Sequence, residues 1–246
     1  MELLNIAIIA AVLSLGAFIK GATGMGLPLI SMPILTSTLG LAHAIGVLVI
    51  PLLVTNFWQA IRFGNEYHDG QMRFLLPMVI ASFVGIGIGT TGLVFLNERL
   101  LVLMLACTIF AYVALRLTRP DFTLSAKAAM RISAPVGLIA GVFQGATGIS
   151  SPVAVTYVHA MRLHYKAHVF ALSVIFFCFT LAQIPALVAV GILQGHWLIE
   201  GMIALLPVAL FLPLGQKVGA IIDQATFDRL ILIFIAFIGV VLVFQG

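Results

Sequence analysis

Two copies of one short passage hold the residues of this chain whose types and spacing could do chemistry. Gly21-Ala-Thr-Gly-Met-Gly-Leu-Pro28 returns as Gly145-Ala-Thr-Gly-Ile-Ser-Ser-Pro152, with five of the eight residues identical at an offset of 124. Glycine lets a backbone turn and be approached closely, and proline suits the first turn of a helix that begins again. The N–H groups at such a helix start favour an anion. The passages therefore predict anion binding by the backbone.

Side chains within and beside the two copies add further donors. We expect the anion-binding residues to be Lys20, Gly21, Thr23, Gly24 and Gly26 around the first copy, and Gln144, Gly145, Thr147, Gly148, Ser150 and Ser151 around the second. At the same offset Gln59 corresponds to Gln183, and we expect both amides to line the same cavity. The alternatives stay open, because small residues also let helices pack closely and glutamines also join helices by hydrogen bonds.

The composition of the chain indicates that these passages lie in a membrane. The 246 residues are 62% hydrophobic and 8% charged, with a mean hydropathy of +1.22. A typical soluble domain carries about 25% charged residues, so an integral membrane protein is the class that fits. The net charge of +4 is spread over short loops, which predicts no nucleic-acid partner.

Lys20 directly precedes the first passage, at the position where the second copy has Gln144. A lysine within a membrane span costs about 2.5–3.5 kcal/mol on insertion scales, which by default indicates a function. The amine of Lys20 could neutralise an anion, or Lys20 could gain and lose a proton during transport. The alternative of equal weight is a lysine that snorkels from the end of an apolar block to the interface.

A continuous helix through the first passage would be too long for a membrane. Residues 3–39 as one helix would measure roughly 55 Å at ~1.5 Å per residue, against a hydrocarbon core of ~30 Å. The segment must therefore break, fold back or tilt strongly, and the same holds for 132–161 around the second passage. Four full spans in each half would make the halves parallel, whereas re-entrant hairpins followed by three spans would make them inverted.

The repeat extends beyond the passages and divides the chain. We predict a first transmembrane repeat over residues 1–118, a linker over 119–126 and a second transmembrane repeat over 127–246. The expected fold is an all-α integral membrane protein. It has about eight transmembrane segments in two homologous four-segment halves, and each half opens with a glycine-broken helix.

Two pairs of glycines correspond in the later part of each half. After an insertion of six residues the offset becomes 130, so that Gly85 and Gly89 match Gly215 and Gly219. Glycines four residues apart line one helix face and let another backbone approach closely. We expect these glycines to pack helices rather than to bind a ligand.

The acidic residues offer little for catalysis. We place all eight at the edges of apolar blocks or in loops: Glu2, Glu66, Asp69, Glu98, Asp121, Glu200, Asp223 and Asp228. The scarcity of buried carboxylates argues against a proton relay of Asp or Glu side chains. Gly148-Ile-Ser150 is a weak signal for a nucleophile, so an intramembrane hydrolase using Ser150 is only an alternative. We expect no enzyme activity, no cofactor and no metal.

The duplicated arrangement resembles the TauE/SafE sulfite exporter family. The motifs that carry the resemblance are Gly21-Ala-Thr-Gly-Met-Gly-Leu-Pro28 and Gln144-Gly-Ala-Thr-Gly-Ile-Ser-Ser-Pro152, with Gly215-x-x-x-Gly219 and Arg229 near the end. The resemblance covers nearly the whole chain. It implies an inner-membrane carrier of sulfite, sulfonates or other small organic anions, coupled to the proton gradient without ATP. Ser150 and Ser151 depart from the glycine-rich pattern and leave the substrate open.

We therefore predict a multi-pass secondary transporter of a small anion in the inner (plasma) membrane, with alternating access to a site between the two repeats. The alternatives are an anion channel, the hydrolase that would use Ser150, and a membrane scaffold or assembly factor without transport. The expected partners are the anionic substrate and the lipid bilayer. A homodimer, the direction of transport, the coupling ion and the membrane orientation are left open.

Overall fold

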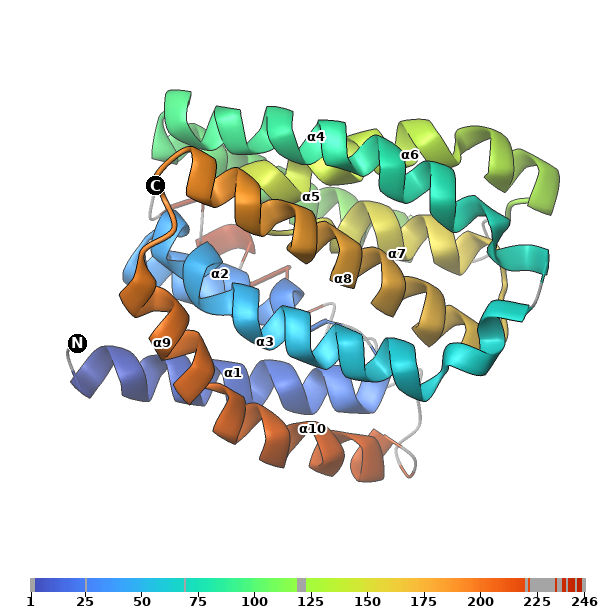
Figure 1. Cartoon of the computed structure of the whole chain (residues 1–246). Helices are drawn as coiled ribbons and strands as arrows, with labels where there is room; N and C mark the ends of the chain where they lie inside the picture. Colours follow the sequence, from blue (N-terminus) through green and yellow to red (C-terminus); the bar gives the residue numbers. More distant parts are fainter. Residues whose placement is uncertain are drawn as a thin grey trace. The chain divides into compact units, whose positions relative to one another are not determined.

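A computed structural model of the chain describes residues 3–24, 26–68, 70–118, 123–219 and 221, with positions 233, 236, 237, 239–241, 243 and 244. The regular elements of these residues are all helices (Figure 1). In chain order they are α1 (Leu3–Thr23), α2 (Leu27–Leu39), α3 (Leu41–Arg62), the 3₁₀ turns η1 (Gly64–His68) and η2 (Gly70–Phe74), α4 (Leu75–Phe95), α5 (Glu98–Thr118), α6 (Ala126–Thr147), α7 (Ser151–Ala160), α8 (Tyr165–Ala189), α9 (Gly195–Ile203) and α10 (Leu205–Gly219).

Six of these helical segments are long and apolar enough to cross a membrane. They are Leu4–Thr23, Leu41–Arg62, Met72–Phe95, Glu98–Leu115, Ala126–Thr147 and Tyr165–Ala189. The pair α9 and α10, bent by 40° at its break, makes a seventh if it is one span. The predicted all-α membrane class is thus confirmed. The count of about eight segments in two homologous halves stays a prediction, and most of residues 227–245 lie outside the described part.

The contacts of the chain define two compact units. The first unit comprises Met1–Pro51, Glu98–Val113 and Leu193–Gly246, and the second comprises Leu52–Asn97 and Ala114–Ile192. Each unit therefore combines segments from both predicted sequence repeats. The repeat boundaries themselves stay predictions, and the matched residues Asp228 and Arg229 lie outside the described part.

Glycines join α4 to α6 in the second unit. A Cβ atom on Gly85 would collide with the carbonyl oxygen of Leu138, and one on Gly89 with that of Val142. In return, a Cβ atom on Gly145 would collide with the Ile86 carbonyl. The two backbones are therefore in direct contact, and the predicted packing role of Gly85 and Gly89 is confirmed.

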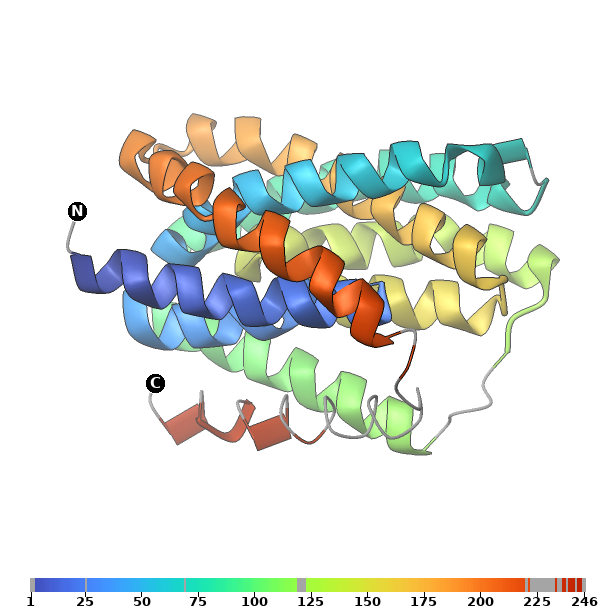
Figure 2. The same ribbon diagram turned by 90° about the horizontal axis from the view of Figure 1, so that it is seen from below.

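The same kind of contact joins α1 to α10 in the first unit, where Figure 2 shows α10 crossing α1. A Cβ atom on Gly215 would collide with the carbonyl oxygen of Phe18, and one on Gly21 with that of Leu212. The packing role of Gly215 is thus also confirmed, whereas the surroundings of Gly219 lie outside the description. In the sequence repeat α1 corresponds to α6 and α10 to α4, so each unit holds one copy of this glycine-lined helix pair.

The short helices α2 and α7, which follow the two glycine passages, fold back on the long helices α1 and α6 that precede them. Ser31 on α2 donates to the carbonyl of Val12 on α1 at 3.3 Å. Tyr157 on α7 donates to the carbonyl of Ala129 on α6 at 2.8 Å, near the start of that helix. Each glycine passage is therefore the turn of a helical hairpin.

Candidate functional site

The second glycine passage forms a tight turn between α6 and α7. α6 ends at Thr147, and Gly148 follows with φ 71°, a left-handed conformation that favours glycine. The Gly148 N–H donates to the carbonyl of Gln144 at 2.9 Å and closes the helix end. α7 then begins at Ser151, with Pro152 in its first turn.

The first passage has the same local design. α1 ends at Thr23, and Gly24 has φ 79° while its N–H donates to the carbonyl of Lys20 at 2.8 Å. Gly26 has φ 109° and precedes α2, which carries Pro28 in its first turn. Met25, between these glycines, lies outside the described residues. Both copies therefore end one helix with a left-handed glycine and start the next with a proline.

The glycines of the passages divide into two kinds. Gly24, Gly26 and Gly148 have a positive φ and make the turns. Gly21 and Gly145 instead face a neighbouring backbone, where a Cβ atom would collide with Leu212 or Ile86. For Gly21 and Gly145 the contacts support the packing alternative, and their predicted role in anion binding stays untested.

Three side chains that the sequence predicts for the site meet in the second unit. Gln144 on α6 donates from Nε2 to Oε1 of Gln183 on α8 at 2.8 Å, and Gln183 returns a bond from its Nε2 to the Gln144 carbonyl at 2.7 Å. Ser150 donates to Oε1 of Gln144 at 2.7 Å. All three side chains are buried. We call Gln144, Ser150 and Gln183 the amide cluster.

The start of α7 beside this cluster retains one buried hydroxyl that the described residues do not satisfy. Ser150 is the N-cap residue of α7 but makes no side-chain cap. The N–H groups of Val153 and Ala154 donate to the Ser150 carbonyl, and Pro152 has no N–H. The hydroxyl of Ser151 is buried, with 2% of the residue exposed, and it has no hydrogen-bond partner among the described residues. Such an unpaired buried group is uncommon and calls for a ligand or water.

The threonines of the two passages serve their own helices. Thr23 donates its hydroxyl to the Ile19 carbonyl at 2.9 Å, and Thr147 donates to the Phe143 carbonyl at 2.8 Å. These are bonds to the residue four positions earlier, typical of threonine in apolar helices. In this conformation neither hydroxyl hydrogen is directed to a ligand, so the predicted roles of Thr23 and Thr147 stay predictions.

Gln59 has a different partner from Gln183. The hydroxyl of Ser173 on α8 lies 3.3 Å from Oε1 of Gln59 and also donates to the Val169 carbonyl at 2.6 Å. Ser173 and Gln183 are separated by about 15 Å along α8. The described bonds thus place the matched glutamines at different levels of one helix, and a shared cavity stays a prediction. Ser173 was not predicted, because a lone serine in an apolar helix gives no signal.

Lys20 is buried, with only 3% of the residue exposed. A snorkelling lysine would reach the surface with its amine, so that alternative does not fit the described structure. Its predicted role beside an anion stays untested.

The expectation that acidic residues lie only at block edges or in loops is wrong for Glu200. Glu200 lies within α9 and is 3% exposed. Its carboxylate pairs with Nε2 of His43 on α3, in the first unit, at 2.5 Å. The apolar residues on both sides of Glu200, Trp197-Leu-Ile and Gly201-Met-Ile, were the signal for burial. The partner could not be found from the sequence, because it lies 157 residues earlier.

Long apolar helices, glycine-lined helix contacts and buried polar turns together define a multi-pass membrane protein. Residues 8–242 match the family described as sulfite exporter TauE/SafE. The chain belongs to this family, and its resemblance to the family in the sequence motifs is confirmed. Membership indicates a membrane transporter of sulfite or related anions. No curated protein and no solved structure matches the chain.

Proposed function

We propose that the protein is a secondary carrier for a small anion such as sulfite or a sulfonate, working in the inner (plasma) membrane without catalysis. Family membership supports the transport class. The observation that carries the proposal is the amide cluster beside the unpaired hydroxyl of Ser151 at the start of α7.

The amide cluster offers an anion neutral hydrogen-bond donors. The hydroxyl of Ser150 now donates to Gln144, and it would turn to donate to a bound oxyanion instead. Ser151 adds a second hydroxyl, and the positive end of the α7 dipole favours negative charge at the same place. Donors without a full positive charge bind an anion moderately, which suits a carrier that must release its substrate.

We further propose, from the sequence repeat alone, that the first passage supplies the other part of the site. Lys20 would neutralise the anion, and Gly24 and Gly26 would allow its approach to the start of α2. The two sequence repeats would expose the site alternately to the two sides of the membrane.

The hydrolase alternative finds no support at Ser150. The described partner of its hydroxyl is the amide oxygen of Gln144, and an amide oxygen cannot take the proton of a nucleophile as a histidine or carboxylate does. Ser150→Ala separates the two functions, because a hydrolase would lose all activity whereas a carrier would keep weakened transport.

Uptake of labelled sulfite and of a labelled alkylsulfonate into proteoliposomes tests the proposed function. We expect saturable uptake of at least one of these anions, which Ser151→Ala weakens. Uptake that rises linearly with concentration, with unitary currents in bilayers, would indicate a channel. No flux of any small anion at any imposed pH gradient would contradict the proposal.

A further inference from the structure

His43, which is half-buried, and Glu200, which is buried, form a close polar pair in the first unit. Nε2 of His43 lies 2.5 Å from Oε2 of Glu200, and the two side chains are 16% and 3% exposed. The imidazole of His43 stacks on the indole of Trp197, with ring centroids 5.0 Å apart and planes 17° from parallel. This stacking and the bond to Glu200 fix the orientation of the imidazole.

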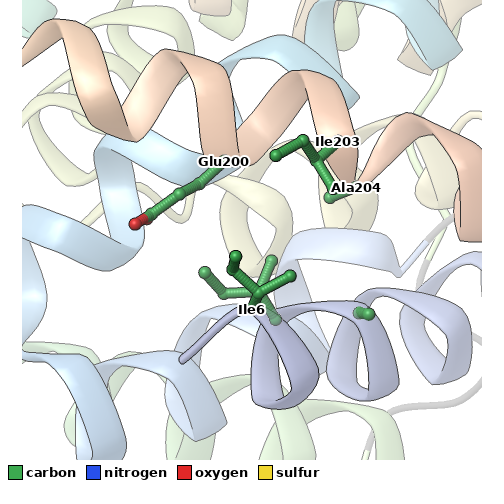
Figure 3. Close-up of a pocket in the computed structure, with 6 residues that line it drawn as sticks. Ile6, Glu200, Ile203 and Ala204 are labelled. Carbon is green, nitrogen blue, oxygen red and sulfur yellow. The ribbon is translucent and has the colours of Figure 1, made fainter. Parts of the chain in front are cut away.

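The surroundings of Glu200 on the side of α1 are apolar. A small cavity there is lined by Ile6, Ile9, Ala10, Glu200, Ile203 and Ala204. In Figure 3 Glu200, Ile203 and Ala204 lie on the α9–α10 segment, and Ile6 faces them from α1. The cavity volume is about 10 Å³, room for about one water molecule. Among the described residues that line this cavity, Glu200 has the only polar side chain.

Few other titratable groups face the pair in the described structure. The ring of His196 lies 6.3 Å from that of His43, edge to face. Glu98, at the start of α5, accepts a hydrogen bond from the N–H of Leu41 at 2.9 Å, close to the beginning of α3. The residues of α1 that line the cavity beside Glu200 are the apolar Ile6, Ile9 and Ala10.

Binding one proton would lower the electrostatic cost of burying this pair. With a neutral imidazole and an ionised carboxylate it carries one net negative charge, which is costly in apolar surroundings. One proton taken from water removes that charge, whether the proton rests on Nε2 or on the carboxylate. No covalent bond other than that N–H or O–H bond changes.

The position of Glu200 links such a proton to the rest of the first unit. α9 packs against α3 through Gly201, whose added Cβ atom would meet the Val47 carbonyl, and through Trp197 against Gly46. Glu200 lies one turn before the 40° bend at which α10 begins. α10 in turn contacts α1 beside the first passage, where Gly215 meets Phe18 and Gly21 meets Leu212. Glu200 therefore lies one turn before the helix that contacts α1 beside the first passage.

We propose that His43 and Glu200 bind the proton that this carrier exchanges during anion transport, and that the bend between α9 and α10 transmits its binding to the first glycine passage. This inference depends on the proposed function for its role in transport. The binding of the proton itself does not depend on it.

Trp197 provides a direct reporter of the pair, because a protonated imidazole stacked on an indole quenches its fluorescence. The chain has two tryptophans, so Trp58→Phe leaves Trp197 alone. The ring of His196 also lies 5.6 Å from that of Trp197, so His196→Asn is added to this background. There we expect a pH-dependent change in Trp197 emission that His43→Asn removes and Glu200→Gln moves by about 1 pH unit or more. The exposed pair of His164 and Glu66 supplies a matched control, and Glu66→Gln should leave the change as it is.

An emission that does not change with pH, or a change that persists unaltered in both His43→Asn and Glu200→Gln, would overturn the proposal.

Transport then tests the coupling between proton binding and anion movement. In proteoliposomes we expect Glu200→Gln to lower uptake driven by a pH gradient about tenfold or more while exchange of internal for external anion continues, with Glu66→Gln unchanged. Gradient-driven uptake by Glu200→Gln at the wild-type rate would overturn the coupling role. A wild-type protein that shows the emission change but moves no anion would instead contradict the proposed function.

Discussion

The hydroxyl of Ser150 donates to Oε1 of Gln144 at 2.7 Å instead of capping the helix that it precedes. Ser150 and Gln144 lie on opposite sides of the left-handed Gly148, so this bond closes the turn across the glycine. Gln144 in turn holds Gln183 on another helix. A ligand that takes the Ser150 hydroxyl would therefore release a bond across the turn, to the same side chain that contacts α8.

The first prediction concerns the amide cluster. Gln183→Met keeps the volume of the side chain but removes both of its hydrogen bonds, and it leaves Nε2 of Gln144 without its partner. We expect the KM for the anion to rise about fivefold, since a lost interhelical bond is worth about 1 kcal/mol. Thr180→Val is the matched control on α8, because the Thr180 hydroxyl bonds only within its own helix in the described structure. Equal KM values for wild type and Gln183→Met in uptake assays would contradict the role of the cluster.

The second prediction concerns the left-handed turn at Gly148. This residue has φ 71°, which asparagine adopts far more readily than a β-branched residue. Gly148→Asn should retain transport, and Gly148→Val should lose it at equal yield of folded protein. Size-exclusion profiles in detergent check the folding, and uptake checks the activity. Transport by the valine variant at the wild-type rate would show that the turn does not need its left-handed residue.

The third prediction concerns the contact between α4 and α6. Gly145→Ala places a methyl group against the Ile86 carbonyl and should destabilise the protein by about 1–3 kcal/mol. Gly87 lies on α4 between the contact glycines but has no atom within 4 Å of an added Cβ, so Gly87→Ala should be neutral or stabilising by about 0.5–1 kcal/mol. Thermal unfolding in detergent measures both. The packing role of Gly145 is wrong if the two variants unfold at the same temperature.

The fourth prediction concerns Lys20. Lys20→Gln introduces the residue that the second copy has at this position and removes the buried amine. If the lysine neutralises the anion, the KM should rise about tenfold or more, because charge-assisted hydrogen bonds contribute about 1.5–3 kcal/mol. Lys217→Gln, at an exposed lysine near the end of α10, is the control. An unchanged KM in Lys20→Gln would remove Lys20 from the anion site.

The parts of the structure that follow from local sequence could be predicted. Hydropathy gives the membrane class, because hydrocarbon and water separate residue types over about twenty positions. The spacing of Gly85 and Gly89 gives the close helix contact, because residues four apart share a helix face. Gln144, Ser150 and Gln183 were each named as candidates, because they lie beside, within or at a position matched by the repeated passages, but the hydrogen bonds that join them were not predicted.

Contacts between distant segments could not be predicted. His43 and Glu200 meet only after folding, and no motif relates two residues 157 positions apart. The hydroxyl of Thr147 could equally have faced a ligand, and the choice of the Phe143 carbonyl depends on its rotamer. The division of the glycines between turns and helix contacts likewise depends on neighbours from other helices, as Gly21 and Leu212 illustrate.

Counterflow of labelled sulfite tests the central claim most directly. Proteoliposomes loaded with a high concentration of unlabelled sulfite receive a trace of labelled sulfite outside, with no pH gradient. A carrier with a saturable site at the amide cluster predicts transient accumulation of the label above equilibrium, which Gln183→Met lowers and Thr180→Val leaves unchanged. Label that only equilibrates, at the same rate in liposomes with and without the protein, would contradict a saturable carrier.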